Sequence, residues 1–299
     1  MNFKLTYKFQ KRDSRDYFFE CKNNASENTS ENTSENVKTP YINSSLITSV
    51  KNIKHASPII LASIKNSVNN INKVNKVVLP ISFSLRNSIA SILNQGPLGS
   101  CVSNAFSLYI STITKSKMNM SRLYHYAVTR SFSQVALSED SGLYIRDGAK
   151  VLGSYGLCQE SLWPYNITKY TLLPPLNVFK NSIIPTKYVY TFISQDLVSL
   201  KSCLVTNNVP IIFGILVYGS FLTSIVATNG IIPMPDLKTE TLQGGHCILI
   251  VGYDDSKQWF ICANSWGTGW GDKGYFYLPY NYVINPNLAG DFCFLTLSL

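Results

Sequence analysis

Residues 263–271 read ANSWGTGWG, and no other stretch of the chain says as much about its fold. Asn264 follows an apolar run that reads as a strand, so its side chain is expected at a strand end. An amide oxygen in that place can accept a hydrogen bond from an imidazole N–H and fix the orientation of the ring. Trp266 and Trp270, in a Gly-rich loop, would shield such a bond from water. The alternative is a surface turn stabilised by packed tryptophan.

A second informative stretch, NQGPLGSC at residues 94–101, brings a cysteine to the start of a predicted helix. Residues 100–117 repeat apolar side chains at spacings of three and four, and Ser100 is the expected N-cap. The partial positive charge of a helix N-terminus favours the thiolate of Cys101, which is the nucleophilic form. On position alone, a small buried structural cysteine is an equal alternative.

Three histidines are candidates for a base. His55 lies in a polar stretch and is expected to be solvated, and His125 lies within a predicted helix with a packed or surface role. His246 follows two glycines and opens an apolar strand, which would hold the imidazole rigidly at the edge of a lobe. A neutral core histidine is the alternative.

Taken together, Cys101, His246 and Asn264 occur in the order typical of papain-like cysteine proteases, with His and Asn 145 and 163 residues after the Cys. The chain resembles this family over residues 79–299. Gln95, six residues before the cysteine, matches the family's oxyanion-hole glutamine. Leu98 stands where the family usually has Cys and Val102 where it has Trp, which removes half of a common disulfide and one aromatic side chain.

The resemblance is greater to a subset of the family from bacteria and large DNA viruses that includes xylellain. The similar motifs lie at residues 13–17, 96–101, 140–148, 161–165 and 251–255. An Asn-, Lys- and Ile-rich composition is typical of an AT-rich genome, so we expect a viral source.

The resemblance implies an α+β fold with a helical left lobe, a β-rich right lobe and the active site in the cleft between them. Periodicity independently predicts helices over 100–117, 121–130 and 145–155, and strands over 210–218, 246–253, 258–263, 274–278 and 291–297. We place the peptidase domain at 79–299. Residues 1–78 form an N-terminal prosegment or linker, with a low-complexity SENT repeat over 26–36.

The resemblance also implies a reaction, in which Cys101 attacks the scissile carbonyl and a thioester acyl-enzyme forms. His246 stabilises the thiolate and protonates the leaving amine, Asn264 orients His246, and Gln95 with the Cys101 backbone N–H holds the oxyanion. The implied substrate-binding residues are Gly142, Leu143, Tyr144, Gly214, Gly244 and Trp266. These residues carry no charge, so an apolar P2 residue is expected, although Leu143 is alternatively a core residue. No insertion resembling an exopeptidase loop occurs between Cys101 and Gly142, and neither cofactor nor metal is expected.

Charge argues against a nucleic-acid partner. Residues 1–78 contain 12 of the 26 Lys and Arg and 6 of the 17 Asp and Glu, so +6 of the net +9 lies outside the predicted domain. No stretch is apolar enough to span a membrane, and the N-terminus lacks the apolar region of a secretory signal. Seven cysteines without CxxC spacing indicate mostly free thiols. We therefore expect the cytoplasm of a cell or infected host, or a virion, as the location.

Two alternatives to an active enzyme stay open. One is a catalytically silent papain-like binding or structural protein, which the presence of all four site residues disfavours. The other is a nucleic-acid-associated protein that uses the basic N-terminus, which the charge distribution disfavours. For the enzyme itself, we expect residues 1–78 to act as an intramolecular inhibitor of a zymogen. Phe3–Phe19 would dock on a lobe while residues 58–77 pass the cleft near Cys101. The opposing interpretation is a passive tail.

Overall fold

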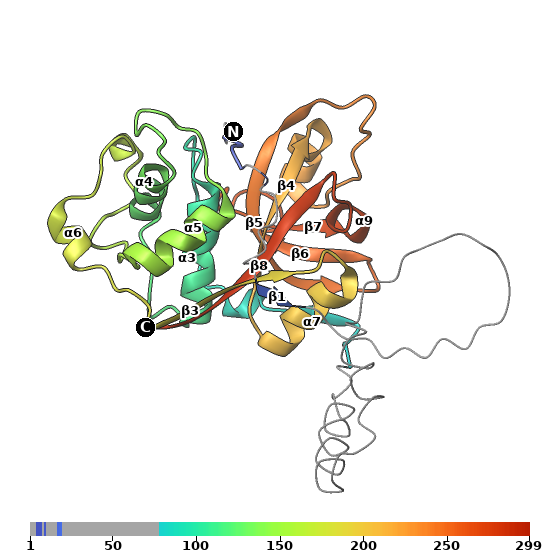
Figure 1. The fold of residues 1–299 in the computed structure, drawn as a ribbon. Helices are drawn as coiled ribbons and strands as arrows, with labels where there is room; N and C mark the ends of the chain where they lie inside the picture. The colour runs from blue at the N-terminus through green and yellow to red at the C-terminus, as the bar shows by residue number, and fades with distance from the viewer. Residues whose placement is uncertain (1–3, 8, 10–16, 20–77) are drawn as a thin grey trace, which may run out of the picture. The chain divides into compact units, whose positions relative to one another are not determined.

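The computed structural model describes residues 4–7, 9, 17–19 and 78–299. Residues 4–7, 9, 17–19 and 79–299 belong to one compact unit. Within it, helices gather on one side and a mostly antiparallel sheet on the other (Figure 1), which confirms the predicted α+β fold of two lobes. His55, the repeat over 26–36 and the stretch 58–77 lie outside the described residues.

The helical lobe is built around one buried helix. Its helices are α3 (Cys101–Ile113), α4 (Arg122–Phe132), α5 (Ile145–Tyr155), the short α6 (Leu176–Lys180) and the 3-10 turn η2 (Ile167–Lys169). Every residue of α3 from Cys101 to Thr112 is buried, because α4 and α5 cover one side and strand β5 the other. The helix is shorter than predicted, since Lys115 and Ser116 adopt left-handed backbone angles. Among the described residues, no helix has the length and apolar character needed to cross a membrane.

The expected N-cap of α3 is in the right place but does not cap. The Ser100 side chain makes no bond to the first-turn backbone. Its Oγ instead lies 2.5 Å from the Tyr165 hydroxyl oxygen and accepts from Asn104 Nδ2 at 3.0 Å. The Ser100 side chain therefore does not accept hydrogen bonds from the first-turn N–H groups of α3. The partial positive charge of this helix end lies beside Cys101.

The sheet of the described residues runs in the order β1-β3-β8-β4-β5-β6-β7, with β2 paired to β5. Its strands are β1 (Tyr17–Phe19), β2 (Ser82–Ser84), β3 (Lys187–Ile193), β4 (Ile211–Tyr218), β5 (Leu242–Asp254), β6 (Trp259–Ala263), β7 (Tyr275–Pro279) and β8 (Ala289–Ser298). Short helical elements connect them: η1 (Arg86–Ser88), α7 (Leu197–Asn207), η3 (Gly219–Leu222), α8 (Ser224–Asn229) and α9 (Tyr280–Val283). Strand β4 is apolar from Ile211 to Val217 and almost wholly buried, because both of its faces are covered.

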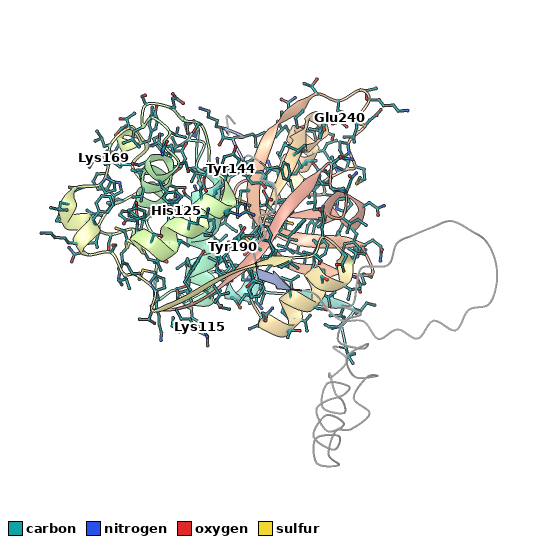
Figure 2. The ribbon with its side chains drawn as sticks, viewed as in Figure 1. Lys115, His125, Tyr144, Lys169, Tyr190 and Glu240 are labelled. Carbon is teal, nitrogen blue, oxygen red and sulfur yellow. The ribbon has the colours of Figure 1, made fainter. Side chains whose placement is uncertain are left out.

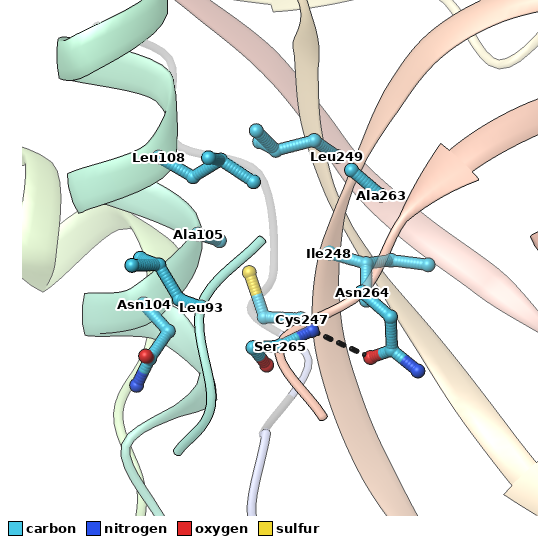
Figure 3. Close-up of a pocket in the computed structure, with 10 residues that line it drawn as sticks. All are labelled: Leu93, Asn104, Ala105, Leu108, Cys247, Ile248, Leu249, Ala263, Asn264 and Ser265. Carbon is cyan, nitrogen blue, oxygen red and sulfur yellow. Dashed lines mark hydrogen bonds between the residues drawn. The ribbon is translucent and has the colours of Figure 1, made fainter. Parts of the chain in front are cut away.

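The two lobes meet where α3 packs on β5. Leu93, Ala105 and Leu108 from the helical side face Cys247 and Leu249 on the strand (Figure 3). The space between them has no room for a water molecule. This dry contact fixes the N-terminus of α3 relative to the start of β5, and those two places carry the predicted Cys and His.

Candidate active site

Cys101 is the first residue of α3 and is fully buried. Its thiol contacts the backbone of Cys247, Val102 and Thr6. Burial raises the pKa of the thiol, and hydrogen bonds from these groups only partly oppose that rise. Cys247 directly follows His246 on β5, so the cysteine and the histidine lie on facing elements of the two lobes. The structure thus brings together two residues that lie 145 positions apart in the sequence.

His246 is held by Asn264, which follows the last residue of β6. His246 Nε2 lies 2.8 Å from Asn264 Oδ1, and the same oxygen accepts from the Ser265 backbone N–H at 2.8 Å (Figure 3 shows the second bond). Because Oδ1 is the acceptor of both bonds, Nε2 must carry the imidazole proton. The buried Nδ1 has no hydrogen-bond partner among the described residues, so it is the nitrogen left to exchange a proton.

Aromatic rings cover this histidine. Trp266 stacks on His246 with ring centroids 4.8 Å apart and an interplanar angle of 22°. Trp270 packs edge-on against Trp266 at 4.9 Å, and Phe221 contacts both tryptophans. The rings exclude water from the His246–Asn264 bond, which strengthens it. This is the shielding arrangement expected from the sequence, with Phe221 as a third ring that the sequence did not indicate.

Gln95 is buried and ties the two halves of the site together. Its Oε1 accepts from Ser265 Oγ at 2.6 Å, and its backbone N–H donates to the Ser265 carbonyl at 2.8 Å. Its Nε2 donates to the carbonyl oxygens of Leu98 at 3.0 Å and Lys4 at 3.2 Å. The resemblance predicts that the Gln95 side-chain amide binds the oxyanion of a substrate. In the structure this amide already donates to the peptide carbonyl of Lys4.

Lys4–Tyr7 lie in the groove between the lobes and contact both. On the helical side, Thr6 Oγ1 donates to the Gly99 carbonyl at 2.8 Å, and Lys4 Nζ pairs with Asp140 at 2.8 Å. On the sheet side, the Tyr7 N–H donates to the Gly245 carbonyl at 2.8 Å. Part of the segment that we expected to dock on a lobe therefore lies near Cys101, while residues 58–77, which we expected to pass the cleft there, lie outside the described residues.

The glycines predicted to bind substrate lie along this segment. A Cβ added at Gly142 would come within 2.0 Å of the Thr6 carbonyl oxygen, and one at Gly244 within 2.8 Å of Leu5. At Gly214 it would come within 1.8 Å of the Tyr7 ring. At each of these three glycines the backbone lies so close to Lys4–Tyr7 that any larger residue would clash with the segment.

The other two predicted pocket residues differ from each other. Leu143 is buried and packs in the main hydrophobic core. Its surroundings therefore fit the alternative prediction, that of a core residue and not a pocket residue. Tyr144 is half-buried at the N-terminus of α5, on the side of the helical lobe nearest the sheet (Figure 2). Gly142, which precedes both residues, lies directly against Thr6 of the segment.

Asp140 is a site residue whose role the sequence did not reveal. Its two carboxylate oxygens accept from the Gly99 N–H at 3.0 and 3.1 Å, and it also accepts from the Tyr126 hydroxyl. These bonds hold the turn that leads into Cys101. Asp140 occurs in a motif quoted above, but nothing local in that motif shows that its partner lies 41 residues earlier.

Burial controls the charge state of the pair. Burial raises the pKa of the Cys101 thiol more than the surrounding hydrogen bonds lower it. Burial also lowers the pKa of His246 to about 4, although the bond to Asn264 opposes this. With Lys4–Tyr7 in the groove, the favoured pair near neutral pH is an uncharged thiol and an uncharged imidazole. His125 has a similarly low pKa of about 4, but it is fixed in the helical lobe by Ser103 and Gly148, which agrees with the predicted packed role.

Comparison with known proteins identifies the family. The family model described as papain family cysteine protease matches residues 79–290. The chain belongs to the papain family of cysteine proteases. It is accordingly a cysteine-type peptidase, as its sequence predicts.

Individual relatives agree with the predicted subset. An uncharacterized peptidase C1-like protein of Acanthamoeba polyphaga mimivirus is 35% identical over 215 residues, or 68% of each chain. Xylellain from Xylella fastidiosa is 34% identical with a TM-score of 0.67, over 74% of this chain and 87% of that structure. A viral cathepsin of Adoxophyes honmai nucleopolyhedrovirus is 28% identical over 68% of this chain and 58% of its own length. The resemblance to bacterial and large-virus members is confirmed.

Proposed function

We propose that this papain-family protease is an endopeptidase in which Cys101 is the nucleophile, His246 the acid and base, and Asn264 the orienting residue. The observation that carries this proposal is the bond between His246 Nε2 and Asn264 Oδ1, which leaves Nδ1 without a partner among the described residues. An imidazole fixed through one nitrogen can transfer a proton only through the other.

The proposed reaction proceeds in two stages. The Cys101 thiolate bonds to the scissile carbonyl carbon, and the C–N bond then breaks as His246 gives its proton to the leaving amine, which leaves a thioester. In the second stage His246 takes a proton from water and the hydroxide attacks the thioester carbonyl carbon. The C–S bond then breaks and the carboxylic acid product leaves, which restores the Cys101 thiolate beside the protonated His246. Gln95 Nε2 and the Cys101 N–H stabilise the oxyanion, and losing one such donor typically costs about 10²–10³ in rate.

For substrate binding we propose an extended peptide held by backbone groups at Gly142 and Gly245. Both glycines already approach the backbone of residues 6 and 7. The side chain at P2 then enters the space over Gly214, between apolar strands, so an apolar body is favoured there.

We further propose that Lys4–Tyr7 inhibit the enzyme in the same chain. The segment covers Cys101, which has no exposed surface, and it occupies the amide of Gln95. It also keeps the reacting pair uncharged, because water is excluded from the groove.

The direction of the segment explains how it escapes cleavage. In a substrate, the P2 residue precedes the carbonyl that is attacked. Here the carbonyl bound to Gln95 belongs to Lys4, and Tyr7, which lies over Gly214, comes three residues later. The segment therefore runs opposite to the proposed substrate path.

Hydrolysis of a peptide library by wild-type protein, Cys101→Ala and His246→Ala tests the catalytic assignment. The wild type is expected to cleave with a bell-shaped pH profile that belongs to the coupled thiol and imidazole, and both variants are expected to lose nearly all activity. Cleavage by Cys101→Ala at the wild-type rate would contradict the assignment. If none of the three proteins cleaves any peptide even when Lys4–Tyr7 have left the groove, the catalytically silent alternative is supported.

Inhibition is tested by comparing the full chain with one that starts at Val77, with a peptide of residues 1–76 added back. The shorter protein should be more active and the peptide should inhibit it. Equal activities, without inhibition by the peptide, would show that the N-terminal segment is passive.

For the place of action we propose the cytoplasm of an infected host, or a virion. The similarity to a mimivirus protein supports a viral setting. None of the six cysteines among the described residues forms a disulfide, which suits a reducing compartment. Detection of the protein in purified virions by mass spectrometry would separate the two places.

A further inference from the structure

A second cysteine lies beside the proposed nucleophile. Cys247 follows His246 on β5, and its backbone contacts the Cys101 thiol. The Cys247 side chain is fully buried in the seam where α3 packs on β5, beside Ala105 (Figure 3). Ala105 lies four residues after Cys101, about one turn further along α3. The thiol of Cys247 therefore faces the side of α3 that carries Cys101.

The two sulfur atoms lie within reach of each other. The Cys101 thiol accepts a hydrogen bond from the Cys247 backbone N–H. A single Cα joins that nitrogen to the Cβ that carries the Cys247 sulfur, so rotation of the side chains moves the two sulfurs toward bonding distance. Burial, and after it the charge of a Cys101 thiolate, raise the pKa of the Cys247 thiol. The ionisation of one thiol thus acts directly on the other.

Other buried cysteines lie on other elements. Cys293 is on β8, which β4 separates from β5. Cys203 belongs to α7, and Cys158 belongs to a separate small apolar cluster of the helical lobe. Of the described cysteines, Cys247 is therefore the one placed to react with Cys101.

The two thiols differ in their reactivity toward an oxidant. In the open groove Cys101 is the thiolate beside the protonated His246, and the thiolate is the form that a peroxide oxidises. Cys247 stays a thiol, because its pKa is raised well above the ordinary value. Oxidation therefore begins at Cys101. Once Cys101 has lost its negative charge, the repulsion that opposes ionisation of Cys247 is removed, so Cys247 reacts next.

We propose that Cys247 is the resolving thiol of Cys101, so that hydrogen peroxide converts the nucleophile into a reversible intramolecular disulfide. This inference rests on the proposed role of Cys101 as the catalytic thiolate. In the first step the Cys101 sulfur gives two electrons to one peroxide oxygen, and an S–O bond forms as the O–O bond breaks. The leaving hydroxide takes the His246 proton and departs as water, which leaves a sulfenic acid.

The second step forms the disulfide. The Cys247 sulfur bonds to the Cys101 sulfur, the S–O bond breaks, and the hydroxyl leaves as water with the Cys247 thiol proton. The Cys101 sulfur then cannot attack a peptide, but a dithiol restores it by exchange. Without Cys247, further peroxide converts the sulfenic acid to sulfinic and sulfonic acids, which dithiols do not reduce. The neighbouring thiol therefore preserves the nucleophile.

The test follows the fate of Cys101 in the full chain, as wild type, Cys247→Ala and Cys262→Ala. Each protein is held in hydrogen peroxide at pH 7.5 until Cys101 no longer reacts with iodoacetamide in denaturant, so all are compared at complete oxidation, however fast the groove opens. Peptide mapping without reductant then identifies the form of Cys101, and dithiothreitol shows how much thiol returns. Cys262, also fully buried but on β6, is the matched control.

Wild type and Cys262→Ala should form the disulfide between Cys101 and Cys247 and regain nearly all of the Cys101 thiol. Cys247→Ala should end mainly as the sulfinic or sulfonic acid at Cys101 and regain about tenfold less thiol. Cys247→Ser, which also lacks the sulfur, replaces the alanine variant if that variant does not fold.

Three results would overturn the proposal: equal recovery in wild type and Cys247→Ala, a disulfide from Cys101 to any other cysteine, or a Cys101 thiol that peroxide leaves unchanged. If the disulfide forms but the reduced wild type hydrolyses no peptide with its groove open, the proposed function is contradicted and the pairing of the two cysteines stands.

Discussion

Acid should open the groove, and the structure gives the size of the effect. With Lys4–Tyr7 in place, the pKa of His246 is about 4, because burial lowers it from the ordinary 6.5. In Cys101→Ala protein with the groove open, the imidazole is hydrated and faces no thiolate, so its pKa should return close to the ordinary value. The open state therefore binds more protons than the closed state between pH 6.5 and 4.

The sign and magnitude follow from this difference. Above pH 6.5 the histidine is neutral in both states and does not affect closure. As the pH falls below 6.5, protonation favours the open state, and the closed state loses roughly 2 kcal/mol at pH 5 by linkage, which is about a 30-fold shift. At pH 4 the loss is about 3 kcal/mol.

Amide hydrogen exchange of the N-terminal segment in full-length Cys101→Ala protein measures this shift. The Tyr7 N–H donates to Gly245, so its protection reports closure. After correction for the intrinsic pH dependence of exchange, protection should fall about 30-fold from pH 7.5 to pH 5. The fall should vanish in His246→Gln. His125→Gln is the matched control, because His125 is equally buried and its bonds lie within the helical lobe. Constant protection of Tyr7, or an unchanged pH dependence in His246→Gln, would refute the reasoning.

Three further predictions follow from the site. Gln95→Ala should lower kcat by about 10²–10³ in peptide hydrolysis, since it removes an oxyanion donor, and should also lower the unfolding temperature, since Ser265 Oγ and the Leu98 carbonyl lose their buried partner; kcat within threefold of wild type would contradict its role. Asp140→Asn should weaken the turn held through Gly99 and lower both kcat and thermal stability, by roughly 1–3 kcal/mol in unfolding free energy; melting curves identical to wild type would exclude this positioning role. Millimolar reductant should raise activity without unfolding the protein, because no disulfide forms among the described cysteines; mass mapping that finds two or more native disulfides would overturn this.

The parts of the fold that could be predicted are those whose residue pattern shows itself within a short stretch of sequence. The periodic apolar residues placed α3 to within a residue at its start, and the β-branched runs of β4 and β5 marked buried strands. Strand β3 was not predicted, because its residues alternate little in burial and its hydrogen bonds go to β8, about a hundred residues later. The failure of Ser100 to cap has the same origin, since its partner Tyr165 is distant in sequence.

The site divides in a similar way. Gln95, Cys101, His246 and Asn264 were proposed from motif and order, and the structure brings their elements together. The bond between Asp140 and the Gly99 N–H and the bond between Asp291 and the Tyr7 hydroxyl were not foreseen, because a turn and a bulge in β8 aim these carboxylates at partners far along the chain. The richness of residues 3–19 in aromatic side chains indicated docking, but only the glycines of the groove show where Tyr7 binds.

Mapping the adduct of an epoxide-type thiol inhibitor tests the central claim most directly. Full-length protein is treated at pH 5, where the groove should open, and the modified cysteine is identified by mass spectrometry alongside residual peptidase activity. We predict one adduct, on Cys101, formed in step with the loss of activity, and no adduct in Cys101→Ala. Loss of activity without modification of Cys101, or an active protein that carries a stoichiometric Cys101 adduct, would contradict the assignment of Cys101 as the nucleophile.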